Sequence, residues 1–283
     1  MAILVVGYSV EWTKDRTLAS QFLAQVREVH EEANAPCTLY LLGEVILAHR
    51  KALESLAENP LFDLQITVSK PLKSVCQVVQ GQTTVWRGAT LEQIDEEVSR
   101  CRSLFNEHFG RPPQGISSPL GFYRGLQDRP DILEVLDRHG IRFCRTYARN
   151  EQDWQPVEFS VEPFWYTSQG FSHILEFPGQ GWQEAIIRRI YGWDDTDGYL
   201  EYVKADANDV ARREELVWSY WAHDWSVLQG TPDMSHISGL LRYAGEIGIE
   251  IMTQEQAYRV LLERERSSRA PKTRADADER GSP

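Results

Sequence analysis

The sequence has few cysteines and no excess of positive charge, and each shortage argues against a class of protein. The four cysteines among the 283 residues lie far apart and form no C-x-x-C pair. Neither a disulfide framework nor a structural zinc site is therefore expected. Lys and Arg number 30 against 42 Asp and Glu, which gives a net charge of −12. This charge disfavours nucleic acid and anionic lipid as main partners, because phosphates bind to basic faces.

Long apolar stretches are also missing, so no segment is expected to span a membrane. The first residues, MAILVVGY, are apolar but lack the basic region and the cleavage site of a signal peptide. They predict a buried first strand, and the protein is expected to be cytoplasmic. The sequence does contain nine tryptophans, a residue type that is common both in cores and where a protein meets sugars or a partner.

Short apolar runs alternate with amphipathic segments along most of the chain, as in α/β proteins. The expected strands are residues 3–8, 37–42, 62–68, 115–118, 141–145, 216–226 and 249–253. The expected helices are residues 18–34, 44–58, 90–109, 130–139, 200–213, 234–247 and 254–263. Thr90, with Gln93 three residues on, predicts a capping box at the start of its helix.

This alternation predicts one α/β barrel-like domain over residues 1–263, because no second block of composition and no internal repeat is present. Residues 264–283 are rich in charged residues, Ser and Pro and contain almost nothing apolar. Such a tail cannot bury enough surface to fold, so we predict that it is disordered.

Several blocks, read in order, resemble the NodB-homology polysaccharide deacetylases, which are carbohydrate esterase family 4-like proteins. The blocks are GYSVEW, CTLYLLGEVILAHRKALESLAENPLFDLQ, GRPPQGISSPLGFYRG, ILEFPGQGWQ, WSYWAHDWSVL and GIEIMTQEQAYRVL. The resemblance runs from the first strand to the last helix. It implies a distorted (β/α) barrel of the polysaccharide deacetylase type, with its site at the carboxyl ends of the strands.

The resemblance also implies a chemistry, namely metal-assisted removal of an acetyl group from an N-acetylated sugar. In the family one carboxylate acts as the base, a second carboxylate and an H-x-x-x-H pair hold a divalent metal, usually zinc, and a later histidine is the acid. The matching positions here hold Ser9 for the base, Glu11 for the metal carboxylate, and Ile66 and Lys70 for the histidine pair. Ile and Lys do not ligate zinc.

A shifted register cannot restore this pair, because the sequence has no histidine between His49 and His108. The usual metal site is therefore predicted to be lost, and no cofactor is predicted. Lys70 could replace the charge of the metal and pair with Glu11, or it could point into solvent like most lysines. Glu11 itself could equally be a solvated residue at a strand end.

The loop GISSPLGFYRG also lacks residues that belong to the family pattern. Ser117 stands where the resemblance places an arginine that orients the base, and Leu120 stands at the position of a tyrosine. A backbone donor near Leu120 could persist, but without a nucleophile or metal it has little to act on. Phe122, Tyr123 and Arg124 remain candidates for the wall of a pocket.

His223 matches the general-acid histidine of the family and is flanked by Asp224 and several aromatic residues, including Trp225. Trp12, Trp182 and Trp225 are predicted to line a cleft and stack on a sugar, although core packing is the competing interpretation. A set formed by Ser9 as nucleophile, His223 as base and an acidic residue is a further possibility.

Two functions are compatible with these residues. The first is a polysaccharide deacetylase-like protein of carbohydrate metabolism that lacks the zinc-dependent activity and binds a glycan or a protein partner. The second is an active hydrolase that deacetylates N-acetylated sugars through a rearranged site on Glu11 and His223, where zinc or another divalent metal would be needed. Fold alone does not decide between them.

Overall fold

The computed structural model describes residues 1–11, 16–79, 82–213 and 215–269, and a nine-stranded sheet lies at its centre. The strands of this sheet are β1 (Ile3–Val10), β2 (Cys37–Leu41), β3 (Phe62–Thr67), β6 (Gly115–Tyr123), β7 (Phe143–Arg149), β8 (Phe164–Tyr166), β9 (Phe171–Glu176), β10 (Val217–His223) and β11 (Glu250–Met252). A separate hairpin consists of β4 (Val75–Val79) and β5 (Gln82–Trp86).

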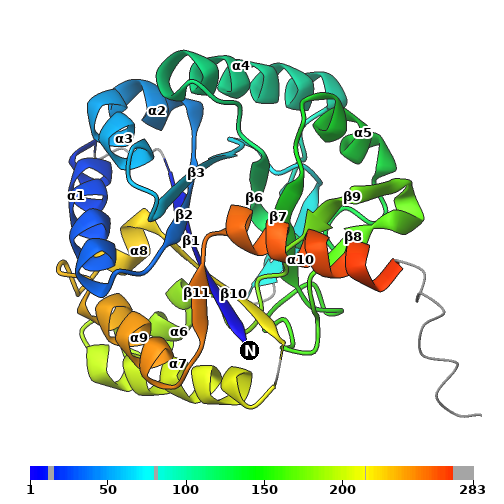
Figure 1. Cartoon of the computed structure of the whole chain (residues 1–283). Coiled ribbons are helices and arrows are strands. Elements are labelled where there is room, and N and C mark those ends of the chain that lie inside the picture. Colours follow the sequence, from blue (N-terminus) through cyan, green and yellow to red (C-terminus); the bar gives the residue numbers. More distant parts are fainter. Residues whose placement is uncertain (12–15, 80–81, 214, 270–283) are drawn as a thin grey trace, which may run out of the picture.

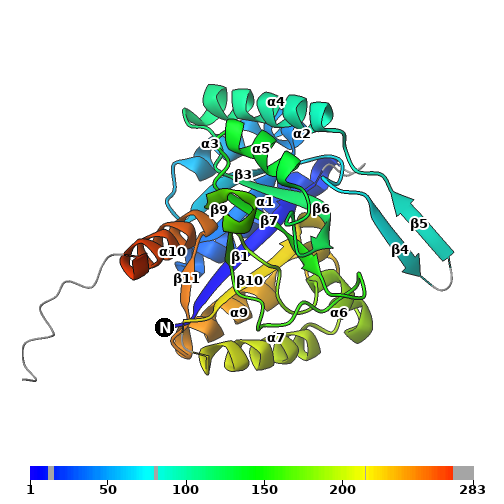
Figure 2. The ribbon, with the colours of Figure 1, turned by 90° about the vertical axis from the view of Figure 1, so that its right-hand side faces the viewer.

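Helices surround the sheet (Figure 1). They are α1 (Arg16–Ala33), α2 (Gly43–Ala48), α3 (Arg50–Ala57), α4 (Leu91–Phe109), α5 (Pro130–Arg138), α6 (Glu184–Tyr191), α7 (Thr196–Ala211), α8 (Asp224–Leu228), α9 (Ser235–Glu246) and α10 (Gln254–Arg269), with a 3-10 turn at Thr167–Gln169. The hairpin β4–β5 projects away from this body (Figure 2).

The strand order is β10-β1-β2-β3-β6-β7-β9-β8, and β11 also pairs with β1. Neighbouring strands are parallel except for β8, which runs antiparallel to β9. Every residue of β1 is buried, as expected for a strand of a parallel sheet that is covered on both faces. Because parallel strands all end at the same edge, their carboxyl ends bring side chains from distant parts of the chain together.

Strands β10 and β9 share no ladder of backbone hydrogen bonds. The side chain of Gln180, which follows β9, contacts β10 in place of such a ladder. This side chain is 2% exposed. The Oε1 atom accepts a hydrogen bond from the backbone N–H of Ser219 at 2.9 Å, and Nε2 donates to the carbonyl of Val217 at 2.8 Å and to that of Val161 at 3.0 Å. One side-chain amide thus satisfies backbone groups of β10 that a neighbouring strand would otherwise pair.

Helix α10 closes the amino-terminal end of the sheet. Ala257 and Tyr258 pack in a small apolar cluster with residues of four strands, namely Ile3, Val5, Phe143, Leu175 and Val217, and with Phe177. Figure 1 shows α10 crossing in front of the strands. The helix runs to Arg269, beyond the predicted end at residue 263, so residues 264–269 of the predicted tail are helical. Its apolar contacts explain why the strongly charged sequence still forms a helix.

Most other elements agree with the prediction to within a few residues. Thr90 and Gln93 form the predicted capping box before α4. The single helix predicted over residues 44–58 is wrong in one respect, since the backbone leaves the helical region at His49 and separates α2 from α3. Helices α6 and α8 were not predicted, and residues 224–226, predicted as the end of the strand over 216–226, belong to α8. Among the described residues, no helix is long and apolar enough to cross a membrane.

The role of Gln180 can be tested by substitution with Leu, which has a similar size but no polar atoms. The N–H of Ser219 and the carbonyl of Val217 would then be buried without partners. We expect the free energy of unfolding in urea to fall by about 3 kcal/mol, since each such group costs roughly 1–3 kcal/mol. Gln21→Leu, on the exposed face of α1, is the matched control, and an equal loss in both variants would contradict this role.

Candidate functional site

The side chains of Arg145, on β7, and Ser9, on β1, contact each other near the carboxyl ends of the strands. Nη2 of Arg145 donates a hydrogen bond to Ser9 Oγ at 2.6 Å. The guanidinium lies 4.6 Å from the ring centre of Tyr40 and 4.9 Å from that of Trp221. Gly7 makes this approach possible, because a Cβ at that position would lie 3.2 Å from Nη1 of Arg145. The residue matched to the catalytic base is therefore held by a cation.

Arg145 carries its charge in a buried position, with 6% of its surface exposed. Burial lowers the pKa of its guanidinium to about 10, so the group remains a cation at neutral pH. Glu11 and Glu176 oppose this effect through their charge, yet neither forms an ion pair with it within the described part of the chain. Nη1 of Arg145 also has no hydrogen-bond partner among the described residues.

Glu11 and His223 face each other at the ends of β1 and β10. Glu11 Oε1 lies 3.8 Å from His223 Nε2. Burial raises the pKa of Glu11, while a hydrogen bond from the Trp225 side chain and the charge of Arg145 lower it. Burial and the charge of Arg145 lower the pKa of His223 to about 3. The imidazole is therefore neutral at pH 7 and does not start a reaction as a protonated acid.

Asp224, the first residue of α8, is the second carboxyl group at this point. Its Oδ2 accepts a hydrogen bond from the backbone N–H of Glu11 at 3.1 Å, and Oδ1 accepts one from the N–H of Trp225 at 2.8 Å. Burial and the charge of Glu11 raise the pKa of Asp224 to about 8. At neutral pH this carboxyl is largely protonated, and it fixes the turn that carries Glu11.

Aromatic rings extend outward from Arg145 in a continuous row. Trp221 lies 5.4 Å from His223, His223 lies 5.5 Å from Trp225 at an angle of 30°, and Trp225 lies 6.1 Å from Trp193. Nε2 of Gln183 lies 3.4 Å from both ring nitrogens of His223. We name Trp221, His223, Trp225 and Trp193 the aromatic row. Trp225 and Trp193 are half-buried, whereas Trp221 and His223 are buried, so the outer two rings are the ones that can offer apolar faces beside polar groups to a sugar.

A cavity of about 90 Å³ adjoins the aromatic row through Gln183. It is lined by Gln77, Leu120, Arg149, Trp154, Gln155, Gln183 and Ile186. Leu120 and Gly121 both have a positive φ, at 69° and 60°. Nε of Arg149 donates to their carbonyls at 3.1 and 3.2 Å and so holds this turn. Leu120, predicted to bind a ligand, is thus placed in the wall of a cavity.

Two of the positions matched to the metal ligands hold side chains that do not ligate a metal. Ile66 is fully buried in the main core. Lys70 is exposed and forms no ion pair within the described ranges, whereas Glu11 pairs with His223. The predicted alternative of a Lys70–Glu11 salt bridge is therefore wrong. Over the part of the chain that the structure describes, no three His, Cys, Asp or Glu residues are grouped so that they could hold a metal ion.

The structure places the remaining predicted residues in different surroundings. Phe122, predicted to bind a ligand, is 3% exposed and belongs to the main core, and its role stays a prediction. Tyr123 is half-buried and packs on Tyr147, and Trp182 is half-buried against the core, so both stay predictions. Trp12 lies outside the described residues.

The predicted set of Ser9, His223 and an acid is brought into one region but not into a hydrogen-bonded chain. Ser9 and His223 are aligned on neighbouring strands, yet among the described residues the hydroxyl of Ser9 is bonded to Arg145 instead. Arg145 was not recognised in the sequence. The available signal was an arginine in the middle of the strand FCRTYAR, whose residues are all buried.

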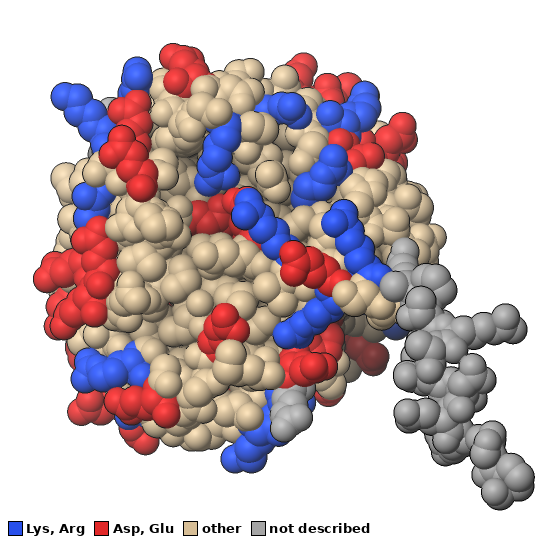
Figure 3. Space-filling view, in the orientation of Figure 1, with Lys and Arg blue, Asp and Glu red and all other residues tan. Residues whose placement is uncertain are grey.

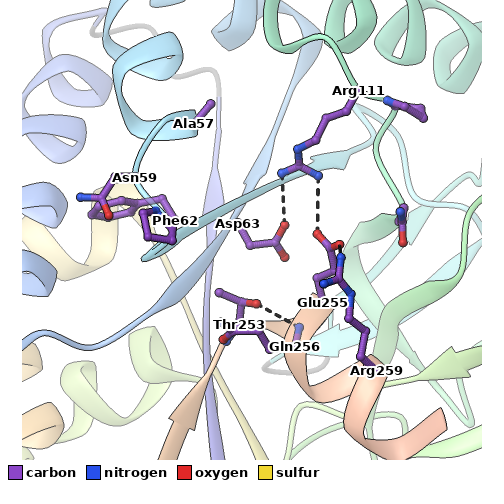
Figure 4. A pocket seen from close by; sticks show the side chains of 12 residues that line it. Ala57, Asn59, Phe62, Asp63, Arg111, Thr253, Glu255, Gln256 and Arg259 are labelled. Atoms are coloured by element: carbon purple, nitrogen blue, oxygen red, sulfur yellow. Dashed lines mark hydrogen bonds and ion pairs between the residues drawn. The ribbon is translucent and has the colours of Figure 1, made fainter. Parts of the chain in front are cut away.

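A larger pocket, of about 450 Å³, lies at the opposite end of the sheet. Arg111 points between Asp63 and Glu255 there (Figure 4), at 3.6 and 3.5 Å. Burial and the charge of Glu255 raise the pKa of Asp63 to about 6. Acidic and basic side chains are interspersed over this face of the molecule (Figure 3). This ion cluster ties β3 to α10, and no predicted site residue lines the pocket.

The sequence matches no family model and no curated protein. Solved structures do match. A protein described as a polysaccharide deacetylase from Mycobacterium smegmatis has a TM-score of 0.62 and 12% identity, over 93% of this chain and 91% of that one. The chain has the fold of the polysaccharide deacetylases. The predicted resemblance and the NodB-type (β/α) barrel are thus confirmed at the level of fold.

Two further neighbours show how varied this fold is in function. PuuE allantoinase has a TM-score of 0.64 and 10% identity, over 91% of this chain and 89% of that one. A CE4 family pseudoenzyme from Bacillus anthracis has a TM-score of 0.54 and 8% identity, over 90% of this chain and 65% of that one. At such identities the likeness establishes the fold and leaves the activity to the residues of the site.

Asp224 should make the stability of the protein depend on pH. Its pKa of about 8 lies above the ordinary value of 3.8, so between these values the native state keeps a proton that the unfolded chain has released. Stability therefore falls as pH rises through this window. Asp224→Asn removes this titration, and the loss of unfolding free energy between pH 5 and pH 8 should shrink by an amount on the order of 2 kcal/mol.

The measurement is urea denaturation of both proteins at the two pH values. The comparison uses the change with pH and not the absolute stability, because Asn accepts only one of the two backbone hydrogen bonds. Asp197→Asn, at an exposed position of α7, should follow the wild type. The same change with pH in wild type and Asp224→Asn would refute the raised pKa.

Proposed function

We propose that this protein is a polysaccharide deacetylase-like protein of carbohydrate metabolism that binds a glycan through the aromatic row and does not carry out zinc-dependent deacetylation. The observation that carries the proposal is the hydrogen bond from Arg145 to Ser9. Where the resemblance places a catalytic base, the chain has a hydroxyl that serves as an acceptor for a buried cation. Its predicted cytoplasmic location belongs to the same proposal.

The positive charge of Arg145 supports the proposed absence of zinc-dependent activity. A divalent cation would need a set of anionic or neutral ligands, and a guanidinium within the same region repels it. The charge of Arg145 already lowers the pKa values of both Glu11 and His223. Of the positions matched to metal ligands only Glu11 has a ligating side chain, since Ile66 and Lys70 offer none.

The structural neighbours make such a loss of activity plausible for this fold. One of them is described as a CE4 family pseudoenzyme, and a mutant of it is described as having restored enzymatic activity. The fold therefore persists when the residues of the reaction change. The aromatic row then supports binding, because tryptophan faces stack on sugar rings while neighbouring polar groups bond to hydroxyls.

A second candidate function is supported by the 3.8 Å separation of Glu11 Oε1 and His223 Nε2. In this alternative, Glu11 and His223 form a rearranged hydrolytic site on N-acetylated sugars. The low pKa of His223 restricts that imidazole to accepting a proton or donating its neutral N–H. A protein partner in place of the glycan would use the same aromatic row.

The experiment measures binding and turnover on the purified full chain. Acetate release from N-acetylated oligosaccharides, with and without added zinc, should remain at the level of the buffer, while calorimetry detects binding of the same oligosaccharides. Trp225→Leu should weaken binding roughly tenfold, equivalent to about 1.4 kcal/mol, because it removes the ring that packs on His223.

Trp165→Leu is the matched control, because this half-buried tryptophan of β8 packs on Tyr258 of α10 and lies outside the aromatic row. It should bind like the wild type. Acetate release that is abolished by Glu11→Ala would establish the alternative and overturn the proposal. Equal weakening in the Trp225 and Trp165 variants would show that the aromatic row is not the binding surface.

A further inference from the structure

Arg145 is a buried cation for which the described residues supply no counter-ion at contact distance. Only 6% of its surface is exposed, and within the described ranges it forms no ion pair. A buried charge is costly unless it is paired and fully hydrogen-bonded. Here Nη2 is used by Ser9, but Nη1 lacks an acceptor among the described residues. The described residues therefore do not use all the hydrogen-bond donors of this guanidinium.

The two carboxylates whose charge reaches Arg145 have other partners. Glu176 accepts hydrogen bonds from the N–H groups of Thr146 and Tyr147 and from the hydroxyls of Thr146 and Tyr166. Glu11 faces His223 and accepts a hydrogen bond from the Trp225 side chain. Neither group is free to turn toward Nη1, so no carboxylate of the described residues supplies an oxygen to this atom.

A small cavity beside Arg145 has room for such an oxygen. Its volume is about 10 Å³, and it is lined by Ser118, Gly121, Arg145, Ala148, Gly179 and Trp221. This is close to the smallest space that holds one water molecule, so it fits a single atom of a ligand. Trp221, which belongs to the lining, is 8% exposed.

The indole N–H of Trp221 adds a second donor at this cavity. Gly179 faces it directly, since a Cβ on Gly179 would lie 2.6 Å from Trp221 Nε1. A guanidinium with an unused N–H and the indole of Trp221 thus line a space that fits one oxygen, and both groups only donate hydrogen bonds.

We propose that the small cavity at Arg145 and Trp221 receives a carboxylate oxygen of the ligand, and that the ligand is an acidic sugar of the uronic acid class. The identity of the ligand as a sugar rests on the proposed function, whereas the anion site rests on Arg145 alone. The carboxylate supplies the missing counter-ion, and the sugar ring lies along the aromatic row that begins at Trp221.

The charges around the site agree with an anionic ligand. His223 stays neutral beside Arg145, and Asp224 keeps its proton at neutral pH because its pKa is raised to about 8. Glu11 is the remaining negative group that faces this region. Its raised pKa means that an incoming carboxylate can further favour the protonated form, which lessens the repulsion.

The test compares D-glucuronate with D-glucuronamide, which has the same ring and a neutral amide in place of the carboxylate. Calorimetry on the full wild-type chain at pH 7 should show at least a tenfold preference for glucuronate. Arg145→Gln should abolish this preference, and Trp221→Phe, which keeps a ring but removes the N–H, should reduce it several-fold. Arg138→Gln, an exposed residue of α5 with an ion pair to Asp95, should retain it.

Sodium acetate serves as a probe of the anion site that is independent of the sugar. Its binding, followed by the fluorescence of the tryptophans, should be lost in Arg145→Gln and retained in Arg138→Gln. Melting curves of each variant identify those that fail to fold, and Trp221→Phe then provides the decisive comparison.

The outcomes separate the two proposals. Equal affinity for glucuronate and glucuronamide in the wild type would overturn the acidic-sugar inference while leaving glycan binding intact. Acetate binding that depends on Arg145, without binding of any sugar, would support the anion site and overturn the proposed glycan function. A preference for glucuronate that survives in folded Arg145→Gln would also overturn the inference.

Discussion

The hydrogen bond between the guanidinium of Arg145 and the hydroxyl of Ser9 is the constraint on which the candidate site depends. It places a permanent cation inside the barrel, between the rings of Tyr40 and Trp221. The charge of this cation adds to burial in lowering the pKa of His223, and it partly offsets the rise that burial causes in the pKa of Glu11. Where the resemblance implies metal ligands, this chain has a buried arginine.

The scaffold supports this arrangement from both ends. At the amino-terminal end α10 covers the apolar cluster around Phe143 and Tyr258, so strand β7 enters the sheet in a fixed register before it reaches Arg145. On the open side of the sheet Gln180 bonds to β10, the strand that carries Trp221 and His223. Trp221 and His223, the first two rings of the aromatic row, therefore stand on a strand whose position is set by packing far from the site.

The fold could be predicted from the sequence because it depends on many weak and repeated signals. The apolar run of β1 and the capping box at Thr90 each specify an element locally, and their order specifies the barrel. The site could be predicted only in part. The absence of a histidine pair can be read from the sequence, but the contact of Arg145 with Ser9 cannot, since these residues lie 136 positions apart in the chain. The burial of Phe122 could not be predicted either, because this residue follows an irregularity in the pairing of β6 with β7.

A zinc titration of the purified full chain by calorimetry tests the central claim most directly. If a guanidinium occupies the region where related folds bind metal, the wild type should show no saturable zinc site that depends on Glu11. Binding of one equivalent of zinc that disappears in Glu11→Ala would contradict the account, because it would show that Arg145 and a metal ion share the site.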